Sequence, residues 1–175
     1  MTDSATWFDG DAPRSAAEAR FLAGLRAHGD AWRDAGLEPS ATRARTVLRP
    51  LHVQVDVPGL PPRDVNLQVG FWTSGPRGTG VEGEWGGDHL LDGDAAGGLA
   101  LFGLPAGPEE LAELTARWLA AALAEPVDRA DWLDADGAVV ASAWRLAGSG
   151  AVVGARGARP RLRRRRPADR VERVR

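Results

Sequence analysis

Two stretches in the first half of the chain alternate regularly between apolar and polar residues. Residues 51–57 read LHVQVDV, and residues 65–72 read VNLQVGFW. An alternation with a period of two residues is typical of a β-strand that has one buried face. The Pro- and Gly-rich residues 58–64 separate the two stretches. We therefore predict two successive strands of one sheet.

The same alternation divides the side chains of these strands between the two faces of the sheet. The apolar set should lie under helices: Val53, Val55, Leu67, Val69 and Phe71. The polar set, with one tryptophan in the same phase, should share the other face: His52, Gln54, Asp56, Asn66, Gln68 and Trp72. We expect any working surface outside the C-terminal end of the chain to lie on this polar face.

Apolar residues at helical spacing predict two amphipathic helices, over residues 15–35 and 108–125. The first opens with a capping box, in which Ser15 and Glu18 satisfy backbone N–H groups of the first turn. The second opens with Pro108, a residue favoured at the first helical position because it has no N–H to leave unpaired.

Shorter apolar runs predict strands over residues 81–85 and 99–104, and a hairpin formed by residues 129–133 and 138–146. Residues 138–146 are apolar on both faces, which indicates an inner strand. The predicted fold is α+β, with a single antiparallel sheet of about five to six strands and two amphipathic helices packed on one face. A disordered Arg-rich C-terminal tail completes the prediction.

The 175 residues suffice for one domain of ordinary size. We predict a loose N-terminal lead over residues 1–14, a single α+β domain over residues 15–150 and a disordered basic tail over residues 151–175. Trp7 and Phe8 are the apolar exception in the lead. Residues 154–175 hold ten arginines against two acidic residues, a net charge of +8, so residues 1–153 must carry −10 to give the total of −2.

Composition excludes several chemistries. The chain has no cysteine, which excludes disulfides, thiol nucleophiles and Cys-ligated zinc. His28, His52 and His89 share no metal-binding spacing, and the Gly-rich residues 75–80 lack the ending of a phosphate-binding loop. We predict no cofactor, no metal and no catalytic residue. An enzymatic role for the His52–Asp56 pair stays open but is not favoured.

An acidic group near the middle of the chain has oxygen ligands suited to a hard cation, but its spacing matches no known calcium loop. Its members are Glu82, Glu84, Asp88, His89, Asp92 and Asp94. We interpret them as solvated turn residues.

Trp72 is the residue that most favours a binding function. The chain has seven tryptophans, and Trp72 is the one that strand phasing places among polar side chains. An exposed tryptophan in a polar setting is a common anchor at protein interfaces. We therefore predict a non-enzymatic, cytoplasmic protein-binding or adaptor protein, of an immunity or accessory type, that binds a protein partner through the polar face. The alternative is that another part of the chain covers Trp72.

A second hypothesis is association with nucleic acid or another anionic surface through the C-terminal arginines, by release of counterions. The residues concerned are Arg161, Arg163, Arg164, Arg165 and Arg166. No run of about 20 apolar residues predicts a membrane span, and no secretion signal is visible. All 22 basic residues are arginines, which suggests a bacterial, GC-rich genome. The oligomeric state stays open.

Overall fold

The computed structural model describes residues 6–46, 50–86, 91, 97–157 and 167–175. Within these residues the chain forms three α-helices, one short 3-10 helix (Pro39–Ala41) and ten strands. The α-helices are α1 (Ala16–Arg26), α2 (Gly29–Asp34) and α3 (Pro108–Ala124). The strands are β1 (Asp9–Gly10), β2 (Thr42–Arg45), β3 (Leu51–Asp56), β4 (Asn66–Trp72), β5 (Gly80–Gly86), β6 (Leu99–Phe102), β7 (Val127–Leu133), β8 (Val139–Leu146), β9 (Val152–Gly157) and β10 (Arg170–Arg173).

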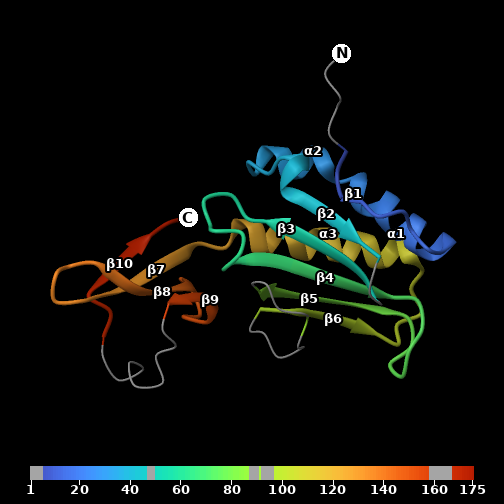
Figure 1. The fold of residues 1–175 in the computed structure, drawn as a ribbon. Coiled ribbons are helices and arrows are strands. Elements are labelled where there is room, and N and C mark those ends of the chain that lie inside the picture. The colour runs from blue at the N-terminus through green and yellow to red at the C-terminus, as the bar shows by residue number, and fades with distance from the viewer. Residues whose placement is uncertain (1–5, 47–49, 87–90, 92–96, 158–166) are drawn as a thin grey trace, which may run out of the picture.

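The strands form two sheets, visible side by side in Figure 1. The first has six strands in the order β1-β2-β3-β4-β5-β6, antiparallel except for the parallel pair β1–β2. The second has four antiparallel strands in the order β10-β7-β8-β9. The α+β class is confirmed, but the prediction of a single sheet is wrong, because the closing hairpin pairs with later strands instead of joining the first sheet.

The C-terminal part of the chain supplies both edge strands of the second sheet. The prediction of a disordered tail is therefore wrong for β9 and β10. The sequence of β10 is mostly charged and shows no alternation of apolar and polar residues. In the structure, Arg170 and Arg173 form ion pairs with Asp131 and Asp128 of the neighbouring strand β7. β8 lies between β7 and β9, which confirms that it is an inner strand.

The N-terminal lead is also partly ordered. Phe8 is fully buried, and both Trp7 and Phe8 pack edge-on against Trp32 of α2. The Trp7 indole lies directly against Gly29, where any Cβ atom would collide with it. The predicted helix over residues 15–35 is therefore split into α1 and α2, with a turn that brings Gly29 to the start of α2.

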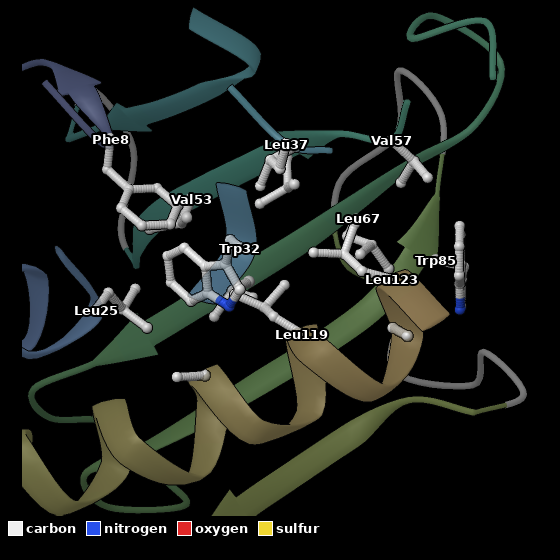
Figure 2. Packing of buried hydrophobic residues seen from close by; sticks show 14 of the residues in the cluster. Phe8, Leu25, Trp32, Leu37, Val53, Val57, Leu67, Trp85, Leu119 and Leu123 are labelled. Carbon is white, nitrogen blue, oxygen red and sulfur yellow. The ribbon is translucent and has the colours of Figure 1, made fainter. Parts of the chain in front are cut away.

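Helices α1 and α3 lie side by side and cover one face of the six-stranded sheet (Figure 1). Gly24 allows this approach, because a Cβ atom there would lie 2.7 Å from the Cβ of Ala112. The rings of Phe21 and Phe71 stack between helix and sheet at 4.4 Å. Figure 2 shows the side chains of this core in contact between β3, β4 and the helices.

The predicted inner residues belong to this core. Their buried side chains are those of Val53, Val55, Leu67, Val69 and Phe71. This part of the sequence-based prediction is confirmed. Since the helices occupy one face of the sheet, the opposite face, which we call the polar face, is the one available for other roles.

Candidate functional site

The strand register gathers the predicted polar residues on the polar face. His52 faces Gly70, Gln54 faces Gln68, and Asp56 faces Asn66 across the β3–β4 pair. The next pair, β4–β5, adds two carboxylates to this face, because Glu82 faces Gly70 and Glu84 faces Gln68. Trp72 lies in the same phase at the end of β4.

A chain of hydrogen bonds crosses the polar face. His52 Nε2 lies 3.1 Å from Gln68 Oε1, Gln68 Nε2 donates to Asn66 Oδ1 at 3.1 Å, and Asn66 Nδ2 donates to the Pro62 carbonyl at 2.9 Å. Since an amide oxygen only accepts, His52 Nε2 carries the proton of this bond. Asn66 and Gln68 are buried, so this series of hydrogen bonds is a fixed part of the structure.

Burial shapes the acid–base behaviour of His52. Its pKa is lowered, first by burial and further by the charge of Arg45, while the hydrogen bond with Gln68 acts in the opposite direction. The neutral imidazole is therefore favoured, because burial penalises the charged form. A neutral His52 acts here as a hydrogen-bond donor to Gln68.

Asp56 lies at the far end of the predicted set and is held from two sides. Gln54 Nε2 donates to Asp56 Oδ1 at 2.8 Å, and Arg43 from β2 lies 3.2 Å from Asp56 Oδ2. Asp56 therefore makes no contact with His52 of the kind that would orient a catalytic base, and the pairing considered in the sequence analysis is not formed.

An aromatic–guanidinium cluster occupies the other end of the polar face. We call it the Trp72 cluster, and it consists of Trp72, Arg77, Glu82 and Phe102. The Arg77 guanidinium lies 3.9 Å from the centre of the Phe102 ring and 5.7 Å from that of Trp72. The two rings are 5.5 Å apart, and Arg77 also pairs with Glu82 at 2.6 Å.

Glycines make the Trp72 cluster sterically possible. Trp72, Gly80 and Phe102 face one another in a row across β4, β5 and β6, so the two rings meet over a position that has no side chain. The Trp72 ring folds back over Gly70, where a Cβ atom would lie 2.6 Å from it, and Leu91 covers the same glycine. Substitution of either glycine would displace an aromatic ring.

The prediction of solvated turn residues is wrong for Glu82 and Glu84. Both belong to β5, an inner strand of the six-stranded sheet, and their exposed fractions are 7% and 4%. Side chains project from the sheet rather than toward the neighbouring strands, so their burial shows that the polar face is covered here: Leu91 lies over Gly70, which faces Glu82, and Arg77 lies on Glu82 itself. The remaining members of that group, Asp88, His89, Asp92 and Asp94, lie outside the described residues.

The accessible part of the polar face is smaller than predicted. Asn66 and Gln68 are buried, whereas His52, Gln54 and Asp56 are half-buried. Trp72 is half-buried as well, and the Arg77 side chain is 54% exposed. Of these side chains, that of Arg77 in the Trp72 cluster is the most accessible to a partner.

Sequence reasoning did not assign three members of the Trp72 cluster to the polar face: Arg77, Phe102 and Glu82, which was interpreted as a turn residue. Phe102 lay in a predicted strand and Arg77 in a predicted Gly-rich turn, but neither could be assigned to the polar face without the register of β5 and β6. The parity of a strand fixes which residues share its own face, whereas the pairing register fixes which residues meet across strands.

The second predicted site cannot be placed. Arg161, Arg163, Arg164, Arg165 and Arg166 lie outside the described residues. In the part of the chain that is described, no three His, Asp or Glu side chains lie close enough together to hold a metal ion.

Comparison with protein-family models, curated proteins and solved structures gave no match for this chain. We therefore infer the function from the geometry of the chain. No helix within the described residues combines the length and apolar character needed to cross a membrane.

Proposed function

We propose that this chain is a non-enzymatic, cytoplasmic protein-binding protein whose anchor is the Trp72 cluster. The observation that carries the proposal is the half-exposed assembly of Trp72, Phe102 and Arg77 at one end of an otherwise polar face. Tryptophan and arginine are the residues most enriched at energetically dominant interface positions, and aromatic residues are common at interface cores.

The Trp72 cluster is also pre-organised, which favours binding. The stacking of Arg77 on Phe102 and its ion pair with Glu82 restrict a side chain that would otherwise lose rotamer freedom on association. Immobilising a long side chain costs about 0.5–1.5 kcal/mol at an interface. A cluster that is already ordered avoids part of this cost, so a partner gains more from the same contacts.

The partner we propose is a protein with a basic contact surface. Residues 1–153 carry a net charge of −10, and a negative field steers a basic partner toward the domain. Asp56 lies at the opposite end of the same polar face from Trp72, so it contributes to the negative field of this face rather than to the contact itself.

The test begins with affinity capture from extracts of cells that encode the chain, followed by measurement of the dissociation constant for the captured protein. Trp72→Ala should weaken binding by at least about tenfold, the loss expected for an interface hot spot. Asp56→Arg should slow association, because it reverses a charge that attracts a basic partner.

Val171→Lys is the matched control, since Val171 lies on β10 of the other sheet and is 64% exposed. This variant should bind like the wild type. Unchanged affinity in Trp72→Ala, or an equal loss in the control, would contradict the proposal.

The alternative function is association with nucleic acid or an anionic surface through the C-terminal arginines. Two described arginines of this region are already paired, Arg170 with Asp131 at 2.6 Å and Arg173 with Asp128 at 2.5 Å. Binding would therefore depend on Arg161 and the run from Arg163 to Arg166. Replacing this run by glutamine, rather than deleting it, keeps β10 in place.

A salt titration distinguishes the alternative from the main proposal. Binding of a DNA duplex through these arginines should weaken steeply with salt and disappear in the glutamine variant, because phosphate contacts release counterions. The alternative would be ruled out if DNA binding did not depend on salt concentration or if the glutamine variant still bound DNA.

A further inference from the structure

Edge strands of a sheet expose unpaired backbone groups, and proteins usually protect them with charges, prolines, bulges or short length. The two sheets have four edge strands, β1, β6, β9 and β10. β1 has only two residues, β9 contains Arg156, and β10 reads RVER. β6 reads LALF and, although it is as short as β10, it contains no charge, proline or bulge.

The outer side of β6 is open within the described part of the chain. All four of its residues pair with β5 on the inner side, and no other backbone hydrogen bond among the described residues reaches them. Figure 1 shows β6 at the lower edge of the six-stranded sheet. The uncharged stretch continues to Pro108, and Leu104 within it is 47% exposed.

We propose that β6 pairs antiparallel with β6 of a second copy of this chain, so that two six-stranded sheets join across a two-fold axis. Open backbone donors and acceptors specify the occupant as another extended strand. A two-fold axis then requires each strand to complement itself, which an uncharged segment satisfies without like charges meeting.

Strand parity limits the registers of such a pair, and we choose the one that centres the two-fold axis on Ala100. Directly opposed residues in an antiparallel pair lie on the same face of the sheet. Leu99 and Leu101 belong to the helix-covered face with Val81, and Ala100 and Phe102 to the polar face with Glu82. A two-fold axis at Ala100 therefore places Leu99 opposite Leu101 of the other copy, and apolar side chains meet beside α3.

This pairing goes beyond the proposed function and does not depend on it. The row formed by Trp72, Gly80 and Phe102 ends at the open side of β6. Dimerisation would continue this row into the second copy and bring two Trp72 clusters onto one continuous polar face.

The absence of cysteine makes a direct test available. Ala100 is exposed, so Ala100→Cys places a single thiol near the two-fold axis, and its counterpart in the second copy lies within roughly 5–8 Å. A short bismaleimide should convert this variant to a covalent dimer. Val171→Cys, on the charged edge strand β10, is the matched control and should stay monomeric.

Sedimentation of the purified wild-type chain over about a hundredfold range of concentration supplies the second measurement. The chain should shift from monomer to dimer, and Ala100→Lys should weaken dimerisation at least about tenfold, because like charges then meet across the axis. Glu82 faces Ala100 across the β5–β6 pair, so a lysine has an opposite charge nearby in the monomer. Circular dichroism checks that the variant is folded.

Three results would overturn the inference. These are a wild-type chain that stays monomeric throughout, equal cross-linking of the two cysteine variants, and dimerisation that Ala100→Lys leaves unchanged. These tests use the purified chain alone, so the absence of dimers would not contradict the binding of a different protein through Trp72. In the same way, the absence of such a partner would not contradict dimerisation.

Discussion

The two sheets of this chain are stabilised in different ways. The six-stranded sheet packs large apolar side chains against α1 and α3, with Phe21 stacked on Phe71 at its centre. One end of the four-stranded sheet joins this core through Trp144 and Leu146, but its separate cluster consists of Trp132 and three alanines. The second sheet therefore depends more on polar contacts than the first.

Asp131 is the centre of those polar contacts. Its carboxylate is 1% exposed and accepts hydrogen bonds from Ser142 at 2.7 Å and from Arg170 at 2.6 Å, while Arg129 lies 3.0 Å away. Burial alone would raise the pKa of Asp131, but the hydrogen bonds from Arg170 and Ser142 outweigh it, and the pKa lies below its ordinary value. These contacts tie β10 and β8 to β7.

The largest effect is expected in the apolar core. Phe71→Ala removes a fully buried ring and should lower the free energy of unfolding by about 3–5 kcal/mol. Urea unfolding measures this loss. A loss below about 1 kcal/mol would contradict the claim that the core between the helices and the six-stranded sheet dominates stability.

A smaller and more local effect is expected in the second sheet. Asp131→Ala leaves Ser142 and two arginines without their acceptor and should cost about 1–3 kcal/mol, since both arginines can turn to water. Hydrogen exchange should accelerate at the amides of β10 and remain slow in β4. Asp136→Ala, in an exposed turn, is the control, and equal acceleration in β4 and β10 would contradict a local role.

The smallest effect concerns the polar face and depends on pH. Because the pKa of folded His52 lies below its unfolded value of about 6.5, the unfolded chain binds protons more readily. Stability should therefore be complete above this value and decline as the pH falls through it toward the folded pKa. His52→Gln should show a flatter profile between about pH 7 and 5 in thermal unfolding, whereas an identical slope would remove His52 as the cause.

Alternation of residue types predicted β3 and β4 of the first sheet well, because one face of these strands is buried in a continuous apolar core, whereas β1 and β2 were not predicted. Val53 and Phe71 could not occupy the polar face without losing that burial. Helix α3 was equally visible, since its N-terminal Pro108 and its apolar stripe follow local rules.

The hairpin of β7 and β8 was predicted, but the edge strands β9 and β10 of the second sheet were hidden for a physical reason. Strand β10 has four exposed residues, and its partners on β7 lie about forty positions earlier, as with Arg170 and Asp131. Ion pairs at such a separation leave no periodic signal. The Trp72 cluster was predicted only in part. Alternation along β4 assigned Trp72 to the polar face, but only the register of β5 and β6 could add Arg77 and Phe102.

The central claim is that the Trp72 end of the polar face contacts a protein partner. The most direct measurement replaces Trp72 by the photoreactive aromatic residue benzoylphenylalanine in the full chain and irradiates it in cells that encode it. Val171 receives the same residue in a parallel variant. We predict a discrete covalent adduct with another protein from position 72 and none from position 171. No adduct at position 72, or the same adduct from both positions, would contradict the claim.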